Sequence, residues 1–487
     1  MSKLLHAIDE QTNKRPNDIA LQDHSRNLSY LELETLSKEW ADIFKLHRIK
    51  KVGIYADNSI DWVVCQLAAY RAGAAVIPIP PFFSKDQIEH LFSSTKPDFV
   101  FAPRELGHLF QNTPELQIPK FIEGKGFQLG ISDISDELKD IALITFTSGS
   151  TGNPKGVLIS HDLIYRVCNS LKIKVQSLDL AMHATTLPLS VMLENVAGVF
   201  LPLVMGKTVY IESLKFWGLE GSSKLNSETF TNALQLTQPS SVIATPEILK
   251  MLLHLKSLNL IPSSIQFIAV GGGKVPVSDL VMAERMGLPV FEGYGLTECG
   301  SVVSLNSTSD RKLGSAGKPL EHVKVSISEE GEILVSGASM SGYLGAPEIQ
   351  NVIHTGDLGE LDDRGFLHVK GRIKNVQINS FGRNFSPEWI ESKINEIPGV
   401  IRSIVFGDGL PHVYVLIQVV ENFPFEKFSE AIEKLNQSLP DYAQIYDFQP
   451  LTQTMIDEQD LLTGNGRIRR TIANKFIEYV FTRKEAI

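Results

Sequence analysis

Residues 1–140 alternate between helically spaced apolar positions and short continuous apolar runs. Tyr30–Phe44 and Ile60–Tyr70 carry apolar side chains at helical spacing, whereas Lys51–Tyr55 and Ala75–Ile79 are short, β-prone runs. Strands that alternate with helices are typical of a largely parallel sheet whose two faces are covered by helices. The pattern therefore predicts an α/β fold for this part of the chain.

The alternation of strand-like and helical segments returns in the middle of the chain, and a different pattern follows it. Ile265–Val270 is a strand-like apolar run that ends in Gly271-Gly272-Gly273, and a helical pattern at Val277–Arg285 and a short strand near Val290 follow it. After about Leu313, short β-prone runs alternate with glycine-rich turns, in the order VKVSI, GEILVSG and FLHVKG. Such runs predict a small antiparallel, barrel-like subdomain.

A further change of pattern comes at Gly371. A strand-like run, a helix, two β-rich runs and an amphipathic helix follow it, at Asn375–Ile378, Pro387–Asn395, Ile401–Phe406, Val413–Val419 and Phe425–Leu435. Together they form a small α+β unit of roughly a hundred residues, a length compatible with independent folding. We predict an N-terminal domain at residues 1–373, with doubly covered sheets and the barrel-like subdomain, and a C-terminal domain at residues 374–487.

Composition and charge argue against several classes of protein, among them nucleic-acid-binding, disulfide-rich and membrane-spanning proteins. The chain has 46 basic and 56 acidic residues and a formal net charge of −10, which argues against a broad nucleic-acid surface. Cys65, Cys168 and Cys299 are too far apart for a zinc motif or a disulfide framework. The start lacks the pattern of a signal peptide, and apolar runs such as Val196–Met205 are shorter than the roughly 20 residues of a membrane span. We expect a soluble, cytoplasmic protein without a transmembrane segment.

The strongest chemical signal is a polar loop that follows an apolar strand. Leu143–Phe146 leads into Thr147–Val157, a stretch with four hydroxyl side chains, three glycines and Lys155. Glycines let the backbone approach a polyphosphate, while N–H groups, hydroxyls and a lysine donate to its oxygens. The stretch does not fit the G-x-x-x-x-G-K-[ST] loop, because Pro154 stands where that pattern needs glycine. The alternative interpretation is a mobile, polar surface loop.

Four segments, in this order along the chain, carry a resemblance to a known family. They are the phosphate-loop segment FTSGSTGNPKGV, the segment Phe291–Glu298 (FEGYGLTE), the segment His354–Asp357 (HTGD), and Gly371–Lys374 (GRIK), which is followed by Gly382 and Pro387-Glu388. Together they resemble the adenylate-forming superfamily, which includes acyl-CoA synthetases, luciferases and the adenylation domains of peptide synthetases. The similarity covers nearly the whole chain. It implies ATP and Mg²⁺ as cofactors and a thiol acceptor, either CoA or phosphopantetheine.

The resemblance also implies which residues contact the nucleotide. Its phosphates would be held by Thr147, Ser148, Gly149, Ser150, Thr151, Gly152 and Lys155. The strand end at Gly271 and Gly272 would line the acyl and adenine pocket. We reject a dinucleotide-binding interpretation of these glycines, because Pro276 stands where that fingerprint requires Gly or Ala.

Further roles implied by the resemblance fall on the next three segments. Tyr294, between Gly293 and Gly295, would lie against adenine. Thr297 would contact the α-phosphate, and Glu298 would hold Mg²⁺, an ion that prefers carboxylate and phosphate oxygens. Asp357 would accept hydrogen bonds from the ribose hydroxyls, and Arg372 would bridge ribose and phosphate. The alternative is a core aromatic at Tyr294 and a simple turn at Asp357.

The C-terminal domain is expected to be mobile. In the family it swings on a hinge between two half-reactions, and that hinge corresponds here to Lys374. The swing would exchange the face that carries Arg467 for the face near Gly382, where a pantetheine arm enters.

Arg467 is the main departure from the family pattern. The segment Leu462–Arg470 resembles one that normally carries a lysine, and this chain has Arg467 in its place. Arginine keeps the charge but adds bulk and a fixed fork geometry. Arg467 either still stabilises the developing charge, or marks slow adenylation or use of mainly the thioester half-reaction, or is one of a solvated basic cluster with Arg469 and Arg470.

The predicted activity is ATP-dependent conversion of a carboxylic acid, a fatty acid by preference, to an acyl-adenylate and then to a thioester. Leu187–Asn195, which shapes the acid pocket in the family, lacks the aspartate that pairs with an amino-acid ammonium, so an α-amino acid is disfavoured. Val196–Met205 either lines an alkyl tunnel or forms a helical core stripe. His183 lies before Pro188, unlike the histidine of many relatives. The alternatives are a non-catalytic, nucleotide-binding relative and an enzyme that delivers to an acyl carrier protein.

Overall fold

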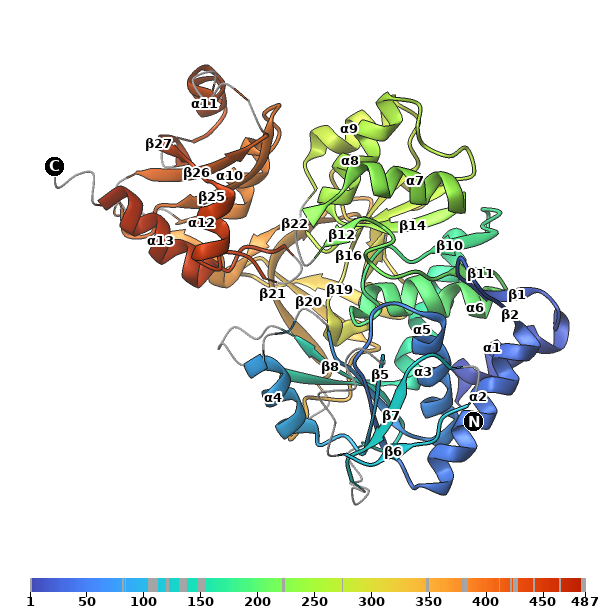
Figure 1. The fold of residues 1–487 in the computed structure, drawn as a ribbon. Helices are drawn as coiled ribbons and strands as arrows, with labels where there is room; N and C mark the ends of the chain where they lie inside the picture. The colour runs from blue at the N-terminus through green and yellow to red at the C-terminus, as the bar shows by residue number, and fades with distance from the viewer. Residues whose placement is uncertain are drawn as a thin grey trace.

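The computed structural model describes most of the chain, and Figure 1 shows its arrangement. The described residues are 2–80, 83, 85–103, 113–119, 122–130, 138–147, 155–220, 224–273, 275–346, 350–378, 380, 384–410, 412–420, 423, 428–440, 443–463 and 466–482. At positions 85, 86, 147, 220, 224, 384 and 482 the description covers the backbone alone. No helix within these residues has the length and apolar character needed to cross a membrane.

A seven-stranded sheet forms the first layer of the N-terminal part. Its order is β6-β7-β5-β3-β4-β8-β9, and β3 runs parallel to both β4 and β5. The strands are β3 (Lys51–Ile54), β4 (Ala75–Pro78), β5 (Phe99–Ala102), β6 (Glu115–Leu116), β7 (Lys125–Gln128), β8 (Ile141–Thr147) and β9 (Lys155–Ser160). The strands expected at residues 51–55 and 75–79 are therefore present.

A nine-stranded sheet lies beside it and carries the functional edge. Its order is β18-β17-β16-β15-β14-β10-β11-β1-β2, and the strands from β16 to β1 in this order run parallel. The strands are β1 (Ile19–Gln22), β2 (Asn27–Ser29), β10 (Met182–Ala184), β11 (Thr208–Tyr210), β14 (Ser241–Ala244), β15 (Phe267–Val270), β16 (Val290–Tyr294), β17 (Ser304–Leu305) and β18 (Lys318–Pro319). Because these strands are parallel, their carboxyl ends meet at one edge, where open α/β sheets bind their ligands.

Helices pack on the two sheets, and local side chains determine where they start. Ser29 and Glu32 form a capping box at the start of α2, and Ser59 caps α3. The helices of the N-terminal part are α1 (Lys3–Lys14), α2 (Tyr30–Leu46), α3 (Ile60–Ala72), α4 (Lys85–Thr95), α5 (His161–Val175), η3 (Glu194–Phe200), α6 (Leu201–Met205), α7 (Ser227–Thr237), α8 (Pro246–Ser257) and α9 (Val277–Arg285). A two-stranded ribbon, β12 (Leu219–Glu220) with β13 (Lys224–Leu225), precedes α7.

The apolar run at residues 196–205 is a buried helical stripe. It begins inside η3, a π-helix, and continues into α6. Val196, Val199 and Phe200 have no exposed surface, and the Phe200 ring stacks on Tyr70 with 5.7 Å between ring centroids. Core packing therefore accounts for this run.

The expected antiparallel subdomain is a four-stranded sheet. It comprises β19 (Val323–Ile327), β20 (Glu332–Gly337), β21 (Val352–Leu361) and β22 (Leu367–Arg372), paired in sequence order. Along β21 buried and more exposed side chains alternate, as expected for a sheet with one face on the core. The predicted α/β fold with an antiparallel subdomain is confirmed.

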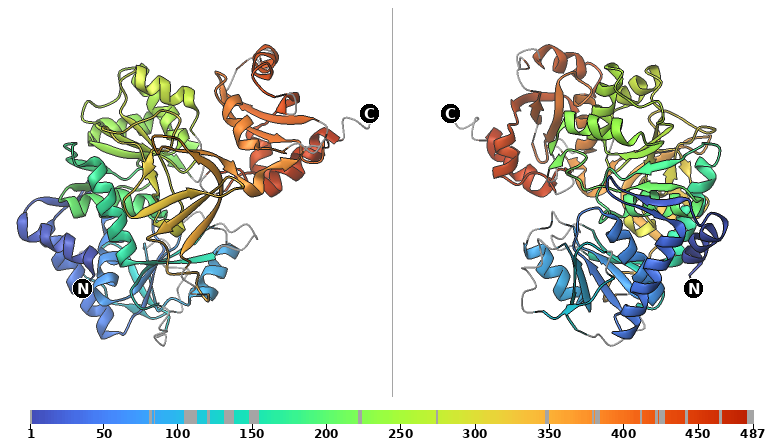
Figure 2. Two further views of the ribbon diagram at one scale, coloured as in Figure 1. Left: turned by 180° about the vertical axis from the view of Figure 1, so that it is seen from behind. Right: turned by 45° about the vertical axis from the view of Figure 1, so that its right-hand side comes forward.

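The C-terminal residues form an α+β unit with cores of its own, and Figures 1 and 2 show it to one side of the two large sheets. Its elements are η5 (Ile373–Asn375), β23 (Gln377–Ile378), β24 (Asn384–Phe385), α10 (Pro387–Ile394), β25 (Val400–Phe406), β26 (Val413–Val419), α11 (Phe428–Asn436), β27 (Ile445–Pro450), α12 (Gln453–Glu458) and α13 (Arg470–Thr482). The expected strand at 375–378 starts two residues late because Asn375 belongs to a 3-10 turn, and residues 425–427 of the last expected helix lie outside the described residues. The division at residue 373 stays a prediction.

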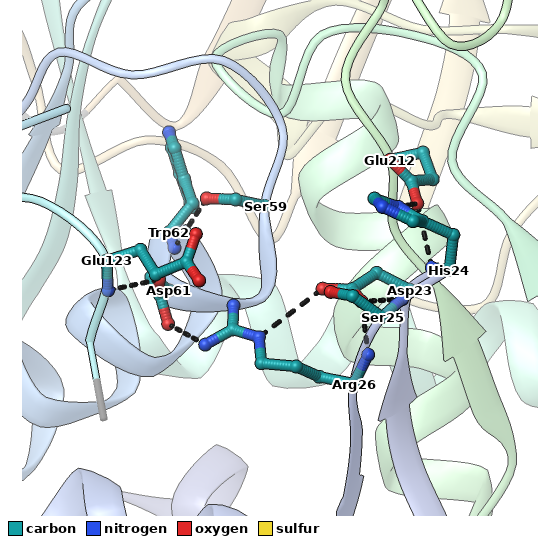
Figure 3. A network of polar contacts seen from close by, with 9 residues as sticks. All are labelled: Asp23, His24, Ser25, Arg26, Ser59, Asp61, Trp62, Glu123 and Glu212. Carbon is teal, nitrogen blue, oxygen red and sulfur yellow. Dashed lines mark hydrogen bonds and ion pairs between the residues drawn. The ribbon is translucent and has the colours of Figure 1, made fainter. Parts of the chain in front are cut away.

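A polar network connects the two large sheets (Figure 3). Arg26 follows the turn between β1 and β2, and its Nη1 donates to Oδ1 of Asp61 in the first turn of α3, at 3.0 Å. Oδ2 of Asp61 accepts from the backbone N–H of Glu123 at 2.8 Å. Burial raises the pKa of Asp61, and the Arg26 guanidinium opposes that rise. The ion pair therefore compensates a buried carboxylate at the junction of the sheets.

The same network contains a group of three side chains with the chemistry of metal ligands, Asp23, His24 and Glu212. Asp23 Oδ1 already accepts from the backbone N–H groups of Ser25 and Arg26. Glu212 Oε1 accepts from the His24 backbone and lies 2.5 Å from its Nδ1. Protein groups thus already contact one oxygen of each carboxylate.

Replacing Arg26 by Met should destabilise the N-terminal part by about 2–3 kcal/mol, because Asp61 is left as a buried, unpaired charge while Arg26 itself is partly exposed. Urea denaturation followed by tryptophan fluorescence measures the loss. The double variant Arg26→Met with Asp61→Asn is the matched control, since the uncharged amide still accepts from Glu123 N–H. It should be less destabilised than the sum of the two single variants, and simple additivity would contradict the ion-pair account.

Candidate active site

Two neighbouring parallel strands end at the site. Val270, the last residue of β15, is in register with Glu292 of β16, and β16 continues for two more residues to Tyr294. Gly272 follows β15 with φ of +78°, a conformation that favours glycine. After β16 the chain passes Gly295 and enters the 3-10 turn η4 (Thr297–Cys299).

Asp357 is the centre of the polar site. It lies on β21 directly opposite Arg372 of β22, and its Oδ1 is 2.8 Å from the Arg372 Nε. Its Oδ2 accepts from the Tyr294 hydroxyl at 2.6 Å. Burial raises the pKa of Asp357, and the nearby Arg372 is the largest opposing influence. The site thus holds a buried carboxylate between a phenol and a guanidinium that remains partly exposed.

A second polar group forms around Glu298. The Tyr343 hydroxyl donates to Glu298 Oε1 at 3.2 Å, and the Lys155 Nζ lies 5.3 Å from the centre of the Tyr343 ring. Burial and the Glu298 carboxylate raise the pKa of Tyr343 to about 12. Tyr343 therefore links the start of β9 to η4. Sequence reasoning missed it, because the segment Ser341–Gly345 shows no pattern that indicates chemistry.

Arg467 reaches this site from the C-terminal part. Its Nε donates to the carbonyl oxygen of Gly272 at 3.0 Å, and its backbone N–H donates to Thr463 Oγ1 at 3.0 Å. Desolvation and the neighbouring Arg372 lower the pKa of Arg467, although its side chain keeps a surface exposed to solvent. The structure thus places three charged groups, Arg467, Arg372 and Asp357, at one site.

The neighbouring arginines do not form a cluster with Arg467. Arg469 Nη1 donates to Asp460 at 2.6 Å, and Arg470 Nη1 donates to the buried Glu391 at 2.6 Å. Arg470 therefore joins α13 to α10 in the interior of the C-terminal part. Arg469 and Arg470 thus have acidic partners of their own, and the role of Arg467 stays a prediction.

A second contact joins the C-terminal part to helix α8, which directly follows β14 of the nine-stranded sheet. Lys250 of α8 directs its Nζ at the carbonyl oxygens of Val400 and Ile401, at 3.5 and 3.4 Å. Lys374, the expected hinge, lies exposed in η5 directly after β22. Its role as a hinge stays a prediction.

Several predicted site residues lie outside the described residues. These are Ser148, Gly149, Ser150, Thr151 and Gly152 of the phosphate loop, and Gly382. Thr147, whose backbone alone is described, ends β8 and pairs with Lys155, the exposed first residue of β9. Gly271, Gly293 and the half-buried Thr297 lie at the strand ends described above. The nucleotide contacts of all these residues stay predictions.

Comparison with known proteins gives a consistent result. A family model described as "AMP-binding enzyme" matches residues 8–344. Two 2-succinylbenzoate–CoA ligases are similar in sequence: that of Bacillus velezensis is 30% identical, and that of Bacillus subtilis 27%. Each alignment covers 82% of this chain and 86% of the relative.

Solved structures with the same architecture cover almost the whole chain. One is the O-succinylbenzoate coenzyme A synthetase of Bacillus subtilis in complex with AMP, with a TM-score of 0.76, 23% identity and coverage of 96% of this chain and 97% of that one. Another is the anthranilate CoA ligase AuaEII in complex with anthranoyl-AMP, with a TM-score of 0.81, 16% identity and coverage of 98% of both chains. At these identities the likeness shows the fold.

Gly295 is the position where the site tolerates a side chain least. A Cβ there would lie 1.8 Å from the carbonyl oxygen of Ser301, whereas a Cβ at Gly271 would meet nothing closer than 3.5 Å. Gly295→Ala should therefore displace the backbone after Tyr294 and destabilise the fold by at least about 2 kcal/mol.

The matched control for this change is Gly271→Ala, in the neighbouring strand end. Its thermal midpoint should stay within about 2 °C of the parent's. Thermal unfolding, followed by circular dichroism in the near and far ultraviolet, compares the two variants. Equal midpoints for both would show that the turn after β16 accommodates a methyl group and would contradict the packing argument.

Proposed function

Because the chain belongs to the AMP-binding enzyme family, we propose that it activates a carboxylic acid with ATP and transfers the acyl group to the thiol of coenzyme A. The observation that carries this proposal is the convergence of Tyr294, Asp357, Arg372 and Arg467 at the carboxyl ends of β15 and β16. These residues come from three of the four segments of the family resemblance and from the C-terminal segment.

The family match confirms the prediction of an adenylate-forming enzyme of the acid–thiol ligase type. The predicted cofactors, ATP, Mg²⁺ and a thiol acceptor, are confirmed. The relatives are CoA ligases, and one structure of the Bacillus subtilis enzyme holds ATP and magnesium ion. The alternative of a non-catalytic relative receives no support from these matches.

The first step would join the acid to the nucleotide. The carboxylate oxygen of the acid attacks the α-phosphorus of ATP, the bond to the β-phosphate oxygen breaks, and pyrophosphate leaves. In this proposal Asp357 accepts from the ribose hydroxyls and Arg372 binds ribose and phosphate. Arg467, held at Gly272, neutralises negative charge that develops between the carboxylate and the phosphate. Preorganised charges of this kind usually supply most of the catalytic effect.

Glu298 fits the requirements of a Mg²⁺ ligand. It is a half-buried carboxylate on a short turn, and Tyr343 holds one of its oxygens. Mg²⁺ is usually bound by one or two carboxylates together with substrate phosphates, and it would supply charge neutralisation of the triphosphate. Tyr343 would then fix the orientation of the Glu298 carboxylate.

The second step would transfer the acyl group. The thiol sulfur attacks the carbonyl carbon of the acyl-adenylate, its proton is lost, and AMP leaves. We propose CoA as the acceptor, in agreement with the names of the relatives. Rotation of the C-terminal part about Lys374 would bring the face near Gly382 to the site for this step. An acyl carrier protein as acceptor is an outcome that the product analysis below distinguishes.

For the acid we propose a compact aryl carboxylate. The prediction of a fatty acid finds no specific support, because the similar ligases are named for 2-succinylbenzoate. The run at residues 196–205, one possible wall of an alkyl tunnel, is packed into the core with Phe200 stacked on Tyr70. An α-amino acid is again disfavoured, since Glu194 is fully buried and bonded to His183, which leaves it no way to pair with an ammonium group.

Isotope exchange between pyrophosphate and ATP tests the proposal over a panel of aryl acids, fatty acids and amino acids. We expect exchange that requires the acid, is strongest with an aryl acid and stops when EDTA removes Mg²⁺. Product analysis with CoA and with a holo carrier protein then identifies the acceptor. If no acid in a broad panel supports exchange, the proposed activity is wrong.

The role of Arg467 can be tested in the same assay. Arg467→Ala should lower the exchange rate by roughly 100-fold or more, because one preorganised charge at the reacting atoms is lost. Arg467→Lys should retain most of the rate, since it restores a cation at the same place. Arg469→Ala is the matched control: it is two residues away and pairs with Asp460. If both Arg467 variants match the parent, the charge-bridging role is refuted.

A further inference from the structure

The segment Leu187–Leu193 leaves β10 at the edge of the sheet that carries the site. His183 is in register with Ser241 of β14, Ser241 with Phe267 of β15, and Ile268 with Val290 of β16. When this register is continued past the strand ends, residue 187 falls level with residues 271 and 293. The segment therefore starts at the same height as the glycines of the site.

Asn58 holds the backbone of this segment from the other large sheet. Its Nδ2 donates to the carbonyl oxygen of Leu187 at 2.8 Å, and its Oδ1 accepts from the N–H of Leu189 at 2.7 Å. Asn58 lies between β3 and α3, and it is 5% exposed. One amide thus pairs with two backbone groups of the segment, as a neighbouring strand would.

Glu194 directly follows the segment and binds the backbone of its first residue, Leu187. Its Oε2 accepts from the N–H of Leu187 at 2.9 Å, and its Oε1 lies 2.9 Å from His183 Nε2. The other ring nitrogen of His183 lies 2.9 Å from Ser241 Oγ. Glu194 and Ser241 thus fix the His183 ring from both sides within the nine-stranded sheet.

The helix that carries Glu194 is shaped to admit this carboxylate. Glu194 opens the π-helix η3, a helix type that often occurs at functional sites. A Cβ on Gly198 would lie 2.1 Å from Glu194 Oε1 and 2.8 Å from His183 Nε2. Only glycine at position 198 leaves room for the Glu194–His183 pair.

A third pair secures the start of η3 to α3. Gln66 Nε2 donates to Asn195 Oδ1, and Asn195 Nδ2 donates to Gln66 Oε1, both at 2.9 Å. Both amides are buried. Buried backbone groups need hydrogen-bond partners, and the side chains of Asn58 and Glu194 provide them for Leu187 and Leu189.

We propose that Asn58 and Glu194 are positioning residues that set the shape of the wall facing the acid, and thereby select the acid. This inference rests on the proposed function. The side chains of the segment that remain partly exposed are apolar: Pro188, Val191 and Leu193. Leu193 also packs against the hydrophobic cores, so Pro188 and Val191 are the side chains that suit the ring of an aryl acid. The two positioning residues fix the backbone that presents these side chains.

Steady-state kinetics of four variants tests the proposal. Asn58→Asp is isosteric but loses the donor to Leu187, and Glu194→Leu loses the acceptor for Leu187 N–H. Both should raise the KM for the acid at least tenfold, leave the KM for ATP within twofold and reduce discrimination among ring sizes. Glu194→Gln keeps an acceptor for Leu187 and, through its amide, a donor for His183, so its acid KM should stay within threefold of the parent's.

The matched control is Gln11→Met. Gln11 is also buried, and it donates to the backbone of Val204 in α6. This change should lower the thermal midpoint without moving either KM. If the KM values for acid and ATP rise together in Asn58→Asp, or if neither moves in a folded variant, the proposal is wrong.

Hydrogen exchange separates this inference from the proposed activity. Amide exchange over residues 185–193 should be faster in Asn58→Asp than in the parent and in Gln11→Met, and unchanged rates would overturn the positioning role. A parent protein without acid-dependent pyrophosphate exchange would overturn the proposed function instead, and amide exchange would then decide whether the two residues hold the segment.

Discussion

The functional site depends on the shared direction of the strands from β10 to β16. Because β10, β14, β15 and β16 are parallel and adjacent, the chain leaves all four at one edge of the sheet. Segments separated by more than a hundred residues in sequence, from Leu187 to Gly295, thereby follow strands that end at the same edge of the sheet. Short loops after these strands are then enough to bring their side chains together. The antiparallel four-stranded sheet contributes Asp357 and Arg372 to the same site.

At this edge of the sheet, burial destabilises the ionised form of a carboxylate, and neighbouring groups stabilise it. Asp357 is removed from water, so its ionised form depends on Arg372, on the hydroxyl of Tyr294 and on the nearby Arg467. A buried carboxylate without such partners would take up a proton. The same groups that stabilise the carboxylate are those proposed to meet a ribose and a phosphate. Fold stability and ligand recognition therefore draw on one set of interactions at this site.

The sequence predicted local features well and long-range contacts poorly. The bounds of α9 and β26 agree with the predicted ranges because each is a continuous periodic run, closed by turn residues on at least one side. The pairing of Asn58 with Leu187, of Arg470 with Glu391 and of Tyr343 with Glu298 left no local signal, because each joins residues far apart in the chain. Arg467 was singled out only by resemblance to a family, since its neighbours in sequence suggest a plain basic surface.

The contacts between the C-terminal part and the nine-stranded sheet have an evolutionary consequence. Arg467 and Lys250 both donate to main-chain carbonyl groups, those of Gly272, Val400 and Ile401. Every residue type supplies such an acceptor, so these hydrogen bonds do not depend on the side chains at the three accepting positions, although the positive φ of Gly272 favours glycine there. The hydrogen bonds described between these two parts of the chain therefore rest on two long basic side chains and on main-chain acceptors.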